Sequence, residues 1–250
     1  MKKRIIALAL TLLMLCSLFA GCGKQSTYKT IEAALAKTQA LSEMSVKTEM
    51  DMTISTESMT MAMPMTLEVK AKDAKSSNPT ILTKLSLSML GQTIATEIYQ
   101  EDGWSYAVMG DMKTKTKSAP QLDQYDYSEE MMQMIPEALM KNVELEKGEN
   151  GSATATITIP GEKFTEIYSD LVDSLGENLS EAEDLTVKDA VVIISVAGGY
   201  VEAYKMSFSL EAYDGDEVSS LNMEASITYE NPGKPVEITP PEGYKDFKEQ

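Results

Sequence analysis

The sequence predicts an α+β fold. A large, curved antiparallel sheet forms an incomplete (half) β-barrel, with an N-terminal helix and two inserted helices packed on its concave side. Two observations lead to this prediction. Long segments alternate between apolar and polar residues, which is typical of strands with one solvent-facing side. Only three segments have helical character, and such short helices cannot cover a large sheet, so the sheet must curve to bury its own apolar side.

The first 21 residues have the composition of a signal peptide. Three basic residues precede an apolar segment at residues 5–15, which is too short to span a bilayer as a stable helix. The segment continues into Leu18-Phe19-Ala20-Gly21-Cys22, which resembles the lipobox of bacterial lipoproteins, although Phe19 stands where that pattern usually has Leu. The resemblance implies cleavage before Cys22, a diacylglyceryl group on its sulfur, and attachment to the extracytoplasmic face of the cell membrane. The alternative is an ordinary secretory signal peptide with an incidental cysteine.

After the lipidated cysteine and a polar tether at residues 22–27, a single half-barrel domain is expected over residues 28–250. A first helix at residues 30–41 is predicted because Ile31, Ala34 and Leu35 share one stripe. The two inserted helices are expected at residues 127–140, kinked at Pro136, and at residues 164–175. Between the second inserted helix and the next strand, residues 176–188 are polar and acidic and are expected to form a loop.

The alternation also predicts how the strands pair. Pairing Ile54 with Met59 in the first long hairpin places every apolar residue on one face, and a slip of one residue would turn one row over. The same test pairs Met89 with Gln92, and Tyr213 with Asp216 in the last long hairpin. The remaining strands are expected at residues 104–109, 112–117, 143–146 and 153–159. The proline-rich segment after residue 231 cannot be a central strand.

The composition restricts the chemistry that is available. The chain contains no histidine, which excludes Ser-His-Asp and Cys-His catalysis and histidine-ligated zinc. Two cysteines cannot build an all-cysteine zinc site, and a formal net charge of −17 argues against a nucleic-acid partner. We therefore expect a protein that is not an enzyme and has no metal and no cofactor.

The order and spacing of several segments resemble a known group of proteins. Cys22 and a helix are followed by a methionine-rich hairpin, then by Tyr99-Gln100-Glu101-Asp102-Gly103-Trp104-Ser105-Tyr106, and finally by Tyr229-Glu230-Asn231-Pro232-Gly233. In this the chain is similar to a family of uncharacterised Gram-positive lipoproteins related to the LolA/LppX-like lipoprotein-carrier superfamily. The resemblance implies a half-barrel whose hollow holds acyl chains, which is an analogy from fold.

Methionine is unusually concentrated in the first long hairpin. Six residues are expected on one face, namely Met50, Met52, Met59, Met61, Met63 and Met65. Flexible thioether side chains suit a surface that adapts to different acyl chains. They can equally form an ordinary core, and methionine sulfur can also bind Cu(I).

The predicted function is binding of an acyl-chain lipid or another hydrophobic ligand in the hollow. The candidate ligand-binding residues are Met50, Met52, Met61, Met63, Leu85, Leu87, Ile94, Trp104, Tyr106, Phe164, Tyr204, Met206, Phe208 and Met223. The expected partners are the membrane, through the anchor on Cys22, and this ligand. The alternative is a non-enzymatic structural or accessory protein of the envelope with a fully packed core.

Overall fold

The computed structural model describes residues 27–117, 143, 145–148, 152–167, 184–214 and 217–249. These residues form two α-helices, thirteen strands and one short 3-10 turn. In chain order they are α2 (Thr27–Gln39), β1 (Met44–Ser55), β2 (Thr60–Lys72), β3 (Thr80–Met89), β4 (Gln92–Glu101), β5 (Trp104–Met109), β6 (Met112–Lys117), β7 (Glu146–Lys147), β8 (Ala153–Ile159), α5 (Gly161–Ile167), β9 (Asp184–Val187), β10 (Ala190–Ala197), β11 (Tyr200–Asp214), β12 (Glu217–Tyr229), the 3-10 turn Tyr244–Asp246 and β13 (Lys248–Glu249).

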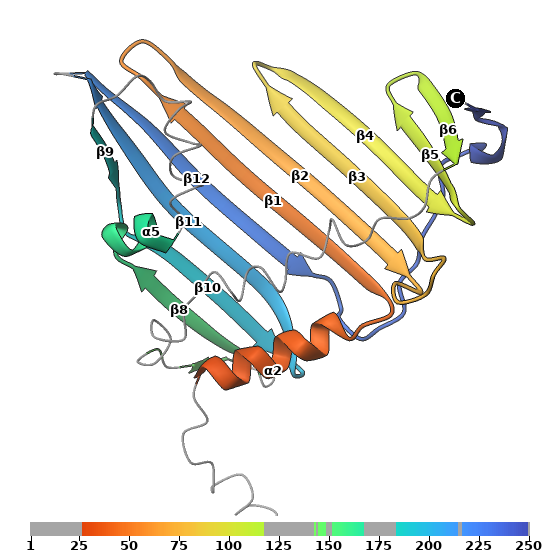
Figure 1. Ribbon diagram of the computed structural model, residues 1–250, viewed down its shortest axis with the longest axis horizontal. Coiled ribbons are helices and arrows are strands. Elements are labelled where there is room, and N and C mark those ends of the chain that lie inside the picture. Colours follow the sequence, from red (N-terminus) through yellow and green to blue (C-terminus); the bar gives the residue numbers. More distant parts are fainter. Residues whose placement is uncertain are drawn as a thin grey trace, which may run out of the picture.

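The strands form one sheet, whose order is β13-β6-β5-β4-β3-β2-β1-β12-β11-β10-β8-β7, with β9 beside β11. The pairing of β1 with β12 joins the first and last long hairpins at the centre of the sheet. Among the described strands only β13 and β6 pair in parallel. The sheet is strongly curved and its two edges do not meet (Figure 1), so the predicted α+β half-barrel is confirmed.

The helices agree with the sequence where they are described. α2 begins three residues earlier than expected, and it buries the predicted stripe of Ile31, Ala34, Leu35 and Thr38. The Thr38 hydroxyl donates to the Ala34 carbonyl at 2.9 Å and accepts the backbone N–H of Val201 at 2.9 Å, which fixes α2 to β11. α5 contains the beginning of the helix expected at residues 164–175. The rest of that helix, and the helix expected at residues 127–140, lie outside the described residues.

One segment expected to be a loop contains a strand. β9, within the polar segment 176–188, pairs antiparallel with β11, so that Val187 lies opposite Leu210. The backbone N–H of Lys188 then donates to the Ser209 carbonyl at 2.9 Å, and its ammonium pairs with Glu211 at 2.9 Å. Four residues are too few to display a period of two, so the sequence pattern could not identify this strand.

The predicted pairing is confirmed in one long hairpin and wrong by two residues in two others. Met89 pairs with Gln92, as expected. In the first hairpin Ile54 pairs with Met61 rather than Met59, because the loop closes with a 2.8 Å hydrogen bond from the N–H of Thr56 to the carbonyl of Met59. In the last hairpin Tyr213 pairs with Val218 rather than Asp216. A shift of two residues leaves the paired side chains on their predicted faces, although it changes each partner. Met59, predicted to lie on the methionine face, instead precedes β2 and is exposed.

The two faces of the sheet differ sharply in polarity. Residues paired across neighbouring strands share a face, and successive residues alternate between faces. By this rule every charged residue of β1–β6 falls on one side, here called the polar face: Lys47, Glu49, Asp51, Glu68, Lys70, Lys72, Lys84, Glu97, Glu101, Lys113, Lys115 and Lys117. The opposite side, here called the apolar face, carries the methionine, leucine and isoleucine rows.

The helices that the structure describes cover the apolar face on β8–β12. α2 and α5 pack against β8–β12, where Ile31, Phe164, Ile157 and Leu210 are almost completely buried. The rings of Phe164 and Phe208 are 4.8 Å apart. Gly161 permits this packing, because a Cβ at that position would lie 2.0 Å from the Val187 carbonyl oxygen.

This division predicts unequal effects of one substitution on two strands. Ile157 on β8 is 0% exposed, whereas Ile94 on β4 is 58% exposed. Ile157→Ala should lower the free energy of unfolding by about 2–5 kcal/mol, because it leaves a cavity in the covered core. Ile94→Ala should cost less than about 1 kcal/mol. Urea unfolding of the delipidated protein measures both, and equal losses would contradict the division of the apolar face.

Candidate functional site

The half of the apolar face on β1–β6 is the candidate functional site, here called the open apolar face. One end of it, at Val69, Ala71 and Ile81, is buried, and the rest is accessible to a greater degree. It includes large apolar side chains that remain in contact with solvent: Leu85 is 38% exposed, Ile94 58%, Met109 45% and Met112 56%. Monomeric soluble proteins rarely expose contiguous apolar surface beyond a few hundred Å², and larger patches mark interaction or ligand sites. The exposure of these residues makes this face a candidate site for an apolar partner or ligand.

Methionines occupy the centre of the sheet, where the open and covered halves meet. Met52 lies between Met63 on β2 and Met223 on β12, and Met50 lies opposite Met65. These side chains are partly buried, and Met52 and Met223 also contact the covered core. An unbranched thioether can change rotamer at little cost, so this boundary can adapt to the shape of whatever lies on it.

The structure brings twelve of the fourteen predicted ligand-binding residues to the apolar side of the sheet. Tyr204 and Phe208 face this side from β11, and Phe164 packs onto it from α5, but all three are buried in the covered core. The other nine are half-buried or exposed and are the residues that a ligand could contact: Met50, Met52, Met61, Met63, Leu85, Leu87, Ile94, Met206 and Met223.

Trp104 and Tyr106 do not share this surface. Because Glu101 pairs with Trp104 and Tyr99 with Tyr106, both side chains lie on the polar face. The prediction that they line the same hollow as the methionines is therefore not supported by their placement. Their position follows from the two-residue turn at Asp102 and Gly103, both of which have positive φ.

Tyr106 belongs to an aromatic cluster that holds the C-terminal segment against the polar face. The ring of Tyr244 lies 5.1 Å from that of Tyr99 and 4.8 Å from that of Tyr106, edge to face in both cases. The Tyr244 hydroxyl donates to the Glu101 carboxylate at 2.9 Å. Burial, reinforced by the nearby Glu101 carboxylate, raises the pKa of Tyr99 well above its ordinary value. The cluster is thus a structural attachment.

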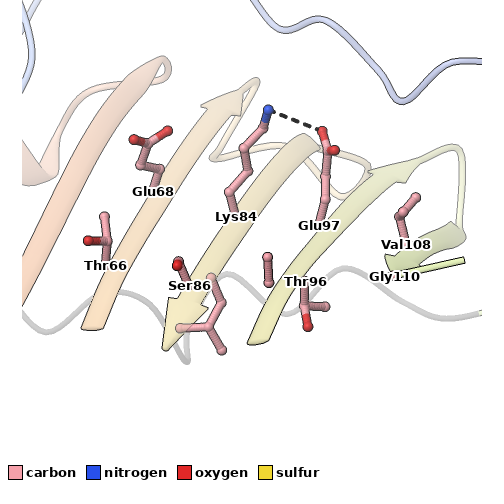
Figure 2. A pocket seen from close by; sticks show the side chains of 10 residues that line it. Thr66, Glu68, Lys84, Ser86, Thr96, Glu97, Val108 and Gly110 are labelled. Carbon is pink, nitrogen blue, oxygen red and sulfur yellow. Dashed lines mark ion pairs between the residues drawn. The ribbon is translucent and has the colours of Figure 1, made fainter. Parts of the chain in front are cut away.

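A depression of about 380 Å³ on the sheet is bordered largely by polar-face residues and is shown in Figure 2. Glu68, Lys84 and Glu97 lie side by side along it, and Lys84 pairs with Glu97 at 3.4 Å. The ammonium of Lys84 and the carboxylate of Glu97 are both accessible to solvent, and an ion pair of this kind contributes at most about 1 kcal/mol. Because charged, solvent-accessible side chains line this depression, it is a poor binding surface for an acyl chain.

Residues outside the predicted ligand-binding set extend the candidate site. Met65 and Leu67 continue the methionine row on β2, and Met109 and Met112 extend the open apolar face onto β5 and β6. The alternation on β2 predicts that Met65 and Leu67 lie on this face, and the turn after Met109 predicts the same for Met109 and Met112.

Two further findings concern the part of the chain that the structure describes. No helix there is long and apolar enough to cross a membrane. No group of three or more His, Cys, Asp or Glu residues within these ranges could hold a metal ion.

Comparison with known proteins gives likeness of fold only. No protein-family model and no curated protein matches the chain. Among solved structures, LprF from Mycobacterium bovis has a TM-score of 0.42 and 12% identity, covering 86% of this chain and 97% of that one. A DUF1329 family protein from Desulfovibrio piger has a TM-score of 0.24 and 9% identity, covering 82% and 93%. A domain from Vibrio parahaemolyticus, named for outer-membrane lipoprotein sorting, has a TM-score of 0.21 and 11% identity, covering 83% and 93%. At these values the similarity supports no conclusion about function.

Proposed function

We propose that this protein is a non-enzymatic, extracytoplasmic lipoprotein that is anchored through Cys22 and binds an acyl-chain lipid on the open apolar face. The main support is the unequal covering of one sheet. The described helices bury the apolar face of β8–β12, whereas on β3–β6 the side chains of Leu85, Ile94, Met109 and Met112 remain accessible. An acyl chain is a ligand that would remove this surface from water without needing any charged partner.

The strength of such binding follows from the apolar area. Burial of one methylene group contributes about 0.8 kcal/mol. Burial of about eight methylenes would contribute roughly 6 kcal/mol before the entropic cost of association is subtracted. Adaptable methionines at Met50, Met52 and Met63 would let chains of different shape reach this contact.

The structural alternative predicts a different surface. A protein that acts only through its outer face needs a fully packed interior, with large apolar residues covered. Ile94 and Met112 are more than half exposed, which favours the ligand-binding proposal over that alternative. The absence of histidine from the sequence supports the non-enzymatic assignment.

A pair of neighbouring substitutions tests the ligand surface. Met63 lies on the apolar face opposite Met52, and Ala62 lies on the polar face opposite Thr53. Met63→Lys should raise the dissociation constant of a fluorescent long-chain acyl probe by about tenfold or more, because it places a charge on the apolar contact surface. Ala62→Lys adds the same charge one residue away and should leave the constant unchanged. Equal effects, or no saturable binding by the folded unsubstituted protein, would refute the proposal.

Membrane attachment has its own test. Cys22→Ala removes the sulfur that would carry the diacylglyceryl group. In a bacterial host the unsubstituted chain should fractionate with membranes and incorporate labelled palmitate, whereas the variant should do neither. Retention of label by the variant would show that the lipid is attached elsewhere, and no label on the unsubstituted chain would show that it is not lipidated.

A further inference from the structure

One end of the open apolar face is polar but uncharged. On β4–β6 the rows nearest the ends of the strands contain Gln100, Ser105 and Thr116, which pair directly across the ladder, with Thr114 in the adjoining row. On β2 and β3 the corresponding positions are Ala71 and Ile81, both completely buried. The polar end is therefore a local feature of three strands rather than a property of the whole sheet end.

These polar side chains are not used by the fold. Gln100, Ser105 and Thr114 are partly buried, and among the described residues none of their side chains forms a hydrogen bond. A half-buried amide or hydroxyl without a partner loses part of its interaction with water and gains nothing in return. Such a group is poised to form hydrogen bonds with a ligand that lies on the same face.

The charges around this end restrict the ligand further. All twelve charged residues of β1–β6 lie on the polar face. On the adjoining edge strand β13, Lys248 lies on the apolar side, where it pairs with Thr114 and is exposed to solvent. A phosphate or carboxylate on Gln100 and Ser105 would thus be partly desolvated with no opposing charge beside it on β4 or β5, which is unfavourable.

The dimensions suit an amphiphile that lies along β4. Gln100, Ile98, Thr96 and Ile94 succeed one another on the apolar face. The seven residues from Ile94 to Gln100 span about 20 Å, at roughly 3.3 Å per step. A single leaflet of a bilayer core is about 15 Å thick, so one long acyl chain together with a small headgroup fits this span.

We infer that the open apolar face selects amphiphiles with an uncharged, hydrogen-bonding headgroup, which Gln100 and Ser105 bind while the acyl chain lies toward Ile94 and Leu87. This inference rests on the proposed function and names the class of ligand. Gln100 offers both a donor and an acceptor, and the Ser105 hydroxyl can act as either, so the site matches glycerol-type hydroxyls or amides.

Two ligands with the same chain test the inference. Monoolein and oleate, measured by displacement of a fluorescent acyl probe at pH 8, differ in headgroup charge. Monoolein should bind about tenfold more tightly than oleate. Ser105→Lys should reverse this preference by supplying a cation to the carboxylate, whereas Ser86→Lys, which adds the same charge on the polar face, should leave it unchanged.

The outcomes separate the two proposals. Saturable binding of both ligands with equal affinity, or tighter binding of oleate, would overturn the inference about the headgroup and leave lipid binding intact. The inference would also be overturned if Lys248→Gln bound oleate more weakly than the unsubstituted protein does. That result would show that Lys248 on β13 binds an anionic headgroup. If neither ligand displaces the probe from the folded protein, and the probe itself does not saturate, the proposed function fails and this inference fails with it.

Discussion

The segregation of charge across one wide sheet is the constraint on which the rest of the structure depends. In β1–β6 every lysine, aspartate and glutamate faces one side, and the methionine rows face the other. The apolar side of such a sheet is unfavourable in water and must be covered. Of the described helices, α2 and α5 cover the part on β8–β12. On the remaining part, Val69, Ala71 and Ile81 are buried, whereas Leu85, Ile94 and Met112 stay exposed at a cost in free energy that a ligand could remove. The position of the core and of the candidate site both follow from this difference in polarity between the two faces and from the unequal covering of the apolar face.

The sequence predicted the faces of the strands better than their partners. Alternation assigned Met50, Met52 and Met63 to one side, because the period of two is fixed by backbone geometry. It could not fix the length of a loop, so two hairpins differ from the predicted register by two residues. The sequence did not predict β9, because its four residues form a strand through tertiary contact with β11 rather than through their own pattern.

The positions of two aromatic residues could not be predicted from residue type alone. Trp104 and Tyr106 were expected beside the methionines because large rings often line pockets, yet their position after the turn at Gly103 places them on the polar face. There Tyr106 packs against Tyr244 and Phe247 of the C-terminal segment, which the sequence marked only as unable to form a central strand. The sequence also could not predict that α2 and α5 cover β8–β12. That placement depends on long-range contacts such as the hydrogen bond between Thr38 and Val201.

The central claim is that an acyl chain lies on the open apolar face, and photo-crosslinking tests it most directly. A fatty-acyl chain bearing a diazirine near its end, bound to the purified protein and irradiated, would attach to the nearest side chains, which peptide mass spectrometry then locates. The account predicts attachment to apolar-face residues of β1–β4, such as Met50, Met63, Met65 and Leu87. Attachment confined to polar-face residues, or no attachment above that of the unfolded chain, would contradict it.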